Sequence, residues 1–186
     1  MLDSLLNLVK EQAAEAVVKN NAIPDSRNDE VINEAANSIQ GGFQNLLSQG
    51  GINEVLKLFS GQGAAQNNIS QQFSGNLVES LVGKLGIDKN AASGIAGSLI
   101  PSVLSSLVTR TNDPNDKSFN IQDLFNNFSG GQTAGFNIQG LLSRVQSGAL
   151  DLDGDGDTDL QDIMMLVSKG GKGGGLMDTI KGIFGK

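Results

Sequence analysis

The sequence predicts an all-α protein: a helical bundle of short helices, with a single helix–loop–helix unit appended near its C-terminal end. Apolar residues recur with a period of about 3.6 residues along the chain, and no convincing stretch alternates as a strand does. The 186 residues are enough to bury a core. Phe residues make up the whole aromatic content of 4%, so Leu, Ile and Val must build most of that core.

Breaks rich in Gly, Pro and Asn divide the first part of the chain into helices. Pro24 separates the first two, because the residue before a proline is pushed out of the α region. Gly50 and Gly51 end the second. The expected elements are a helix capped by Asp3 or Ser4 and reaching about Asn20, a helix from Ser26 to Gln49, a short helix Ile52–Phe59, and a loop Ser60–Asn68.

The middle of the chain contains two clear boundary signals and one proline inside a helical pattern. Gly86 is suited to end a helix, and Asp88 to cap the next one. Pro101 is expected to kink or split that next helix near Ile100. The expected elements are a helix from Ile69 to Leu85, a helix from Lys89 to Val108, a polar linker Thr109–Asn120, a short helix Ile121–Phe128, and a joint at Ser129–Gly131.

The composition excludes several classes of function. The chain has neither Cys nor His, which rules out disulfides, the usual zinc sites, thiol nucleophiles and His-based acid–base catalysis. The net charge is −7, but six of the 20 acidic residues lie in residues 151–162. The other 14 nearly balance the 13 basic ones. No basic stripe is present, which argues against nucleic-acid binding. Because no signal peptide and no run near 18 apolar residues is seen, we expect a cytoplasmic location.

One segment, Asp151–Asp162, has the residue spacing of a loop that binds a hard divalent cation. Calcium loops of twelve residues place oxygen ligands at positions 1, 3, 5, 7, 9 and 12, with Gly at position 6 for a sharp turn. Gly156 is sixth here, and Asp157 at position 7 offers its backbone carbonyl. Calcium is the favoured ion and magnesium the alternative. The predicted metal ligands are Asp151, Asp153, Asp155, Asp157, Asp159 and Asp162.

Apolar residues at helical spacing flank this loop on both sides, and Asn137 is predicted to cap the helix that precedes it. Helix, loop and helix form the EF-hand arrangement, and the loop most resembles the dockerin type. It departs from the usual EF-hand because Asp162 replaces Glu at position 12 and Thr158 replaces an aliphatic residue at position 8. It is also a single hand, whereas such hands normally work in pairs. A lone hand could pair across a dimer or lean against the N-terminal bundle.

Two segments carry a resemblance to the YidB-like family of small bacterial proteins. One is Gly50–Leu58, with the sequence Gly-Gly-Ile-Asn-Glu-Val-Leu-Lys-Leu. The other is Leu81–Leu107, with a Leu-Gly-Ile-Asp turn, a helix of Ala, Ser and Gly, and a Leu-Ile-Pro continuation. The resemblance covers roughly residues 1–130 and implies an all-helical fold with no assigned activity. The expected organisation is a YidB-like domain at 1–130, an EF-hand-like calcium unit at 131–169, and a Gly-rich linker with a short basic amphipathic tail at 170–186.

These observations predict a non-enzymatic calcium-binding protein in which the ion is a structural or buffering element first and a sensor second. The expected partner is an unidentified protein or a second copy of the chain. Two alternatives stay open. Residues 176–184, with apolar positions on one face, could dock on a membrane surface. Leu81–Leu107 could be a DNA-binding helix–turn–helix, although only Lys84, Lys89 and Arg110 are basic nearby.

Overall fold

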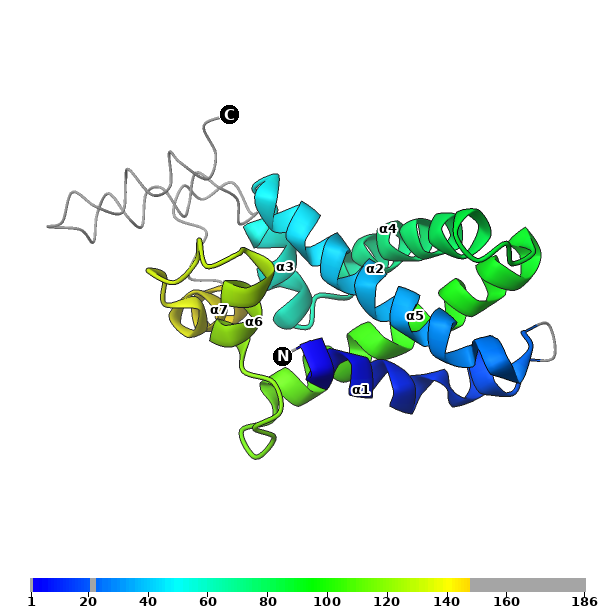
Figure 1. The fold of residues 1–186 in the computed structure, drawn as a ribbon. Coiled ribbons are helices and arrows are strands. Elements are labelled where there is room, and N and C mark those ends of the chain that lie inside the picture. The colour runs from blue at the N-terminus through cyan, green and yellow to red at the C-terminus, as the bar shows by residue number, and fades with distance from the viewer. Residues whose placement is uncertain (1, 21–22, 148–186) are drawn as a thin grey trace, which may run out of the picture.

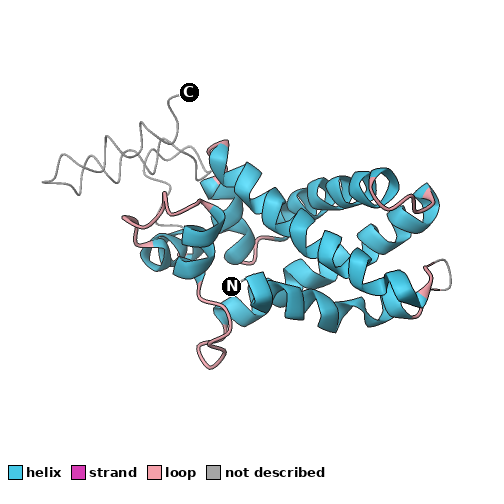
Figure 2. Ribbon diagram, in the orientation of Figure 1, coloured by secondary structure: helices cyan, strands magenta, loops and turns pink. Residues whose placement is uncertain are grey.

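Seven α-helices and no strand make up the described part of the chain, which confirms the all-α class there (Figures 1 and 2). The computed structural model describes residues 2–20 and 23–147. Three helices have 21, 21 and 24 residues, so the prediction that all the helices are short is wrong. The helices are α1 Leu2–Ala13, α2 Asn28–Ser48, α3 Ile52–Phe59, α4 Gly63–Gly83, α5 Lys89–Asn112, α6 Ile121–Phe128 and α7 Ile138–Gln146.

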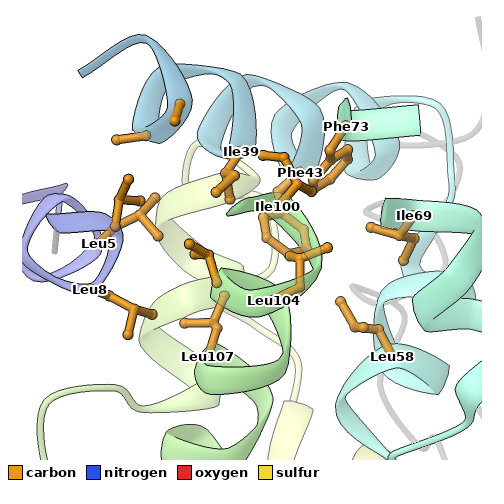
Figure 3. Close-up of a cluster of buried hydrophobic side chains, with 14 of the residues drawn as sticks. Leu5, Leu8, Ile39, Phe43, Leu58, Ile69, Phe73, Ile100, Leu104 and Leu107 are labelled. Atoms are coloured by element: carbon orange, nitrogen blue, oxygen red, sulfur yellow. The ribbon is translucent and has the colours of Figure 1, made fainter. Parts of the chain in front are cut away.

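The long helices lie side by side, and the three short ones gather at one end of them (Figure 1). α4 and α5 pack along each other as a hairpin, with α1 and α2 against them. α3, α6 and α7 contact one another at the end far from the hairpin turn. Buried apolar residues from all seven helices form a single cluster, and Figure 3 shows side chains of α1, α2, α4 and α5 meeting inside it.

The turn between α4 and α5 forms as its residues predict. Gly86 has a φ of +61°, a left-handed conformation that glycine adopts without strain. The carboxylate of Asp88 accepts hydrogen bonds from the backbone N–H groups of Asn90 and Ala91, at 2.9 and 3.2 Å. These bonds satisfy two of the donors that a helix start leaves unpaired. Ile87, between the two signals, is buried, and it anchors the turn to the core.

The centre of the core is an aromatic cluster built around Phe43 of α2. Its ring stacks on Phe128 of α6 at a centroid distance of 4.7 Å and meets Phe73 of α4 edge-on at 5.0 Å. The ring of Phe59 in α3 lies 6.3 Å from it. Offset and edge-to-face pairs at such distances are favourable beyond the area that they bury. One side chain therefore holds four helices together.

Two predicted boundaries in the first half of the chain are wrong. The first helix begins at Leu2, so Asp3 and Ser4 lie inside its first turn rather than at its cap, and it ends in a π-helical turn, Ala14–Val18. A 3-10 turn at Asp25–Arg27 precedes α2, which therefore starts after Ser26. Both errors are small because a cap can be satisfied at neighbouring positions.

The predicted loop Ser60–Asn68 is mostly helix, since α4 begins at Gly63. Only Ser60, Gly61 and Gln62 connect α3 to α4, with Gly61 at a φ of +83°. Ala and Gln have good intrinsic helix propensity, so the first turns of α4 extend ahead of its first buried residue, Ile69. The Gly and Asn content of this stretch suggested a loop, but its neighbours outweigh it.

α5 runs without interruption through Pro101, contrary to the expected split, and continues to Asn112. Proline removes one hydrogen bond and frees the carbonyl of the residue four positions earlier. That residue, Gly97, is exposed, so water can solvate the freed carbonyl. On either side of the proline, Ile100 and Val103 are fully buried, and this packing holds the helix together.

α5 is also the one helix in the described residues that is long and apolar enough to cross a membrane, with a mean hydropathy of 1.5 over 18 residues. The sequence had suggested that no such segment exists. Core helices of water-soluble proteins meet the same criterion, and 44% of this window is buried inside the bundle. The helix packs against α1, α2, α3 and α4, as expected of a core helix.

The close approach of α2 and α4 requires glycine at position 42. A Cβ there would lie 2.4 Å from the ring of Phe73, which is fully buried and held against Phe43. We therefore expect Gly42→Ala to lower the free energy of unfolding by about 1–3 kcal/mol through overpacking. Urea unfolding followed by circular dichroism measures this change.

The neighbouring Gly41→Ala is the matched control. Nothing lies within 4 Å of a Cβ at Gly41, and alanine is the better helix former, so this variant should be as stable as the natural chain or more stable. Equal destabilisation of the two variants would show that the α2–α4 contact is not tight.

Candidate functional site

The structure describes the approach to the predicted cation loop rather than the loop itself. Asp151, Asp153, Asp155, Asp157, Asp159 and Asp162 lie outside the described residues, as do residues 176–184. Within residues 2–20 and 23–147, no group of three or more Asp, Glu, His or Cys residues could hold a metal ion. The helix that precedes the loop, α7, ends at Gln146, five residues before Asp151.

α7 begins where the sequence predicts. The side-chain oxygen of Asn137 accepts a hydrogen bond from the backbone N–H of Gly140 at 2.8 Å, which caps the helix. A Cβ at Gly140 would sit 3.1 Å from that Asn137 side chain, so the small residue helps the cap to close. Ile138, Leu142 and Val145 are buried on one face. The predicted cap and apolar face of this helix are confirmed.

α7 belongs to the same core as the helices of residues 1–130. It packs against α3 and α6, and its buried residues join the single apolar cluster. A further link comes from Gln122 in the first turn of α6, whose side-chain oxygen accepts a hydrogen bond from the backbone N–H of Ile138 at 3.0 Å. Of the two arrangements left open for a lone hand, this part of it leans against the bundle.

A polar cavity of about 660 Å³ lies beside α7, between the end of α5, the connection from Asp113 to Asn120, and α6. Three carboxylates line it, from Asp113, Asp116 and Asp123, together with the single cation of Lys117. None of the three carboxylates forms an ion pair within the described residues. α7 contributes Gln139, Leu142 and Gln146 to its wall. The cavity therefore adjoins the point from which the chain continues towards the cation loop.

Asp116 is the one group in this cavity with a clear shift of its pKa. The backbone N–H of Ser118 donates a hydrogen bond of 2.8 Å to its carboxylate, and the Ser118 hydroxyl and the Arg110 guanidinium add to the effect. These interactions lower the pKa of Asp116 below its ordinary value of 3.8. A lower pKa makes this carboxylate a weaker base.

A short repeat escaped the sequence reasoning. Phe119–Leu124 reads Phe-Asn-Ile-Gln-Asp-Leu, and Phe136–Leu141 reads Phe-Asn-Ile-Gln-Gly-Leu. In both copies the Asn caps the helix that follows, through Asn120 for α6 and Asn137 for α7. The Gln of the first copy accepts the hydrogen bond from the Ile of the second. A search for internal similarity would have found the signal.

The arrangement of α4 and α5 gives little support to the helix–turn–helix alternative. The exposed side of α5 carries Ser and Gly residues, which read base edges poorly. Of the three nearby basic residues, Lys84 forms an ion pair with Glu34 at 2.5 Å, and Arg110 forms one with Glu11. These cations hold helices together, which leaves few of them for phosphate contacts.

No family model, curated protein or solved structure matches this chain. The resemblance to YidB-like proteins therefore stays a prediction from the residues quoted for it. The functional argument rests on the chain itself.

The cap of α7 provides a test of how this helix is anchored. We expect Asn137→Ala to lower the free energy of unfolding by about 1 kcal/mol, because the Gly140 N–H loses its acceptor. Asn137→Asp keeps an acceptor and should be close to the natural chain. Urea unfolding measures all variants, with Asn33→Ala on the exposed side of α2 as the control for a simple Asn-to-Ala change. Equal stability of Asn137→Ala and Asn33→Ala would contradict the cap.

Proposed function

We propose that this chain is a non-enzymatic, calcium-binding helical protein whose ion is held by the loop Asp151–Asp162. In this proposal the carboxylates of Asp151, Asp153, Asp155, Asp159 and Asp162 and the backbone carbonyl of Asp157 are the ligands. The observation that carries it is the spacing of these residues, with Gly156 at the position that needs a sharp turn. Magnesium is the alternative ion.

The charge distribution supports this proposal. Six carboxylates in twelve residues repel one another, and a divalent cation relieves that repulsion. The remainder of the chain is nearly balanced, with 14 acidic and 13 basic residues, so the strong acidity is confined to the loop. Many oxygen ligands suit the large, flexible coordination shell of calcium better than the strict octahedron of magnesium.

The helix before the loop adds a second line of support. α7 is capped, packed on two neighbours, and ends five residues before the first proposed ligand. A helix held in this way gives the loop a fixed starting point, which reduces the conformational entropy lost when the ion is bound. The proposed role of the ion is therefore to stabilise the C-terminal part of the chain for contact with an unidentified protein partner or a second copy.

The side chains near α7 favour binding over catalysis. Catalysis by a carboxylate needs a pKa raised towards neutrality, whereas the pKa of Asp116 is lowered. The chain also has no His, Cys or Tyr to act as a base or nucleophile. A non-enzymatic role follows as part of the proposal.

Replacing two of the proposed ligands tests the assignment. We expect Asp151→Asn combined with Asp155→Asn to abolish calcium binding at millimolar calcium, because two of the anionic ligands are lost. Equilibrium dialysis of the full chain against calcium measures the bound ion.

The matched control is Asp113→Asn combined with Asp123→Asn in the polar cavity. This double variant makes the same change in charge and should bind calcium as the natural chain does. Unchanged binding in the Asp151 and Asp155 variant, or its loss in the control, would place the site elsewhere.

A further inference from the structure

We propose that calcium binding to Asp151–Asp162 is coupled to the stability of α3 and α6, through α7 and the aromatic cluster around Phe43. This inference rests on the proposed function, and it adds how the ion would be sensed by the rest of the molecule. Coupling of this kind needs a continuous packed connection between the two regions. Each link of that connection lies in the described residues up to the end of α7.

The first link is the packing of α7 on α3 and α6. Ile138 is fully buried, and Leu142 is 2% exposed. The hydrogen bond from the Ile138 N–H to the Gln122 side chain joins the first turns of α7 and α6. Because side chains of protein cores are close-packed, loosening α7 removes contacts from both of its neighbours.

The second link runs from α6 into the aromatic cluster. The ring of Phe128 stacks on Phe43 of α2, and the ring of Phe125 lies 6.3 Å from that of Phe59 in α3. Phe125 and Phe59 are almost completely buried. A change in the position of α6 must therefore disturb α2 and α3. The connection leads from α7 to the centre of the core in two steps.

The link between the ion and α7 is electrostatic. Five residues span at most about 17 Å, so Asp151 cannot be farther than this from Gln146 at the helix end. The C-terminus of a helix carries the negative end of its dipole, and nearby anions destabilise it. Six carboxylates follow the end of α7, and only Arg144 in its last turn opposes them. A bound divalent cation reverses part of this unfavourable field and stabilises the last turn of α7.

Hydrogen exchange of the full chain tests the coupling. Amide exchange is compared with excess chelator and with saturating calcium, and it is read separately for α3, α6 and α7. Typical coupling free energies correspond to changes of about 5–150-fold, so we expect calcium to slow exchange in α3 and α6 within this range. The Asp151 and Asp155 double variant should show no such change.

Two pairs of variants identify α7 as the connection. Gln122→Leu removes the hydrogen bond to Ile138, whereas the control Ser74→Ala removes a comparable side-chain bond, from Ser74 to the Ala96 carbonyl between α4 and α5. Leu142→Ala and the control Leu5→Ala each delete a buried leucine side chain, and Leu5 lies in α1, which is not among the neighbours of α7. We expect Gln122→Leu and Leu142→Ala to reduce the calcium-dependent protection of α3 and α6, and the controls to keep it.

The outcomes separate this inference from the proposed function. If no calcium binds to the natural chain, the proposed function fails, and the coupling fails with it. If calcium binds but slows exchange in α7 alone, only the coupling is overturned. Equal effects of Gln122→Leu and Ser74→Ala on the protection of α3 and α6 would also overturn it. If Leu142→Ala does not fold, the milder Gln122→Leu still decides the result.

Discussion

The close approach of α2 to α4 at Gly42 is the contact on which the rest of this bundle depends. With no side chain at that position, the ring of Phe73 can lie against the α2 backbone and meet Phe43 edge-on. Phe43 then forms the centre on which Phe59 and Phe128 pack, so α3 and α6 are placed by the same contact. A larger residue at position 42 would push α4 away and disturb each of these pairs.

This arrangement also determines where the chain leads towards its acidic loop. α6 is anchored by Phe125 and Phe128, and α7 is anchored on α6 and α3. The first helix of the proposed calcium unit is therefore an integral part of the bundle core. An ion bound a few residues further on would act on a helix whose other face already supports the core. For this reason we regard stabilisation of the fold as the first consequence of the proposed ion binding.

Local signals explain which parts of the fold could be predicted from the sequence. The caps Asp88 and Asn137 and the bounds of Ile52–Phe59 and Ile121–Phe128 follow from side-chain chemistry within a few residues, and the structure confirms them. The loop Ser60–Asn68 and the split at Pro101 were wrong because tertiary packing overrides weak local preferences. The glycine at position 42 carries no local signal, since its reason is a ring from α4.

The same distinction applies to the candidate site. The proposed cation ligands lie within twelve consecutive residues, so their spacing alone suggests a chemistry, although the loop lies outside the described residues. The polar cavity combines side chains of α5, α6, α7 and the connection between α5 and α6. No sequence pattern announces a cavity assembled from several helices. Its carboxylates also matter as the reference against which the specificity of the acidic loop is judged.

Calorimetric titration of calcium, and then magnesium, into the chelator-treated full chain tests the central claim most directly. Circular dichroism during the titration follows helicity, because the chain has no Trp or Tyr to report by fluorescence. The account predicts saturable binding of one calcium ion for each chain, together with a gain of helix. The absence of heat with both cations would contradict it and would leave the acidic loop without a ligand.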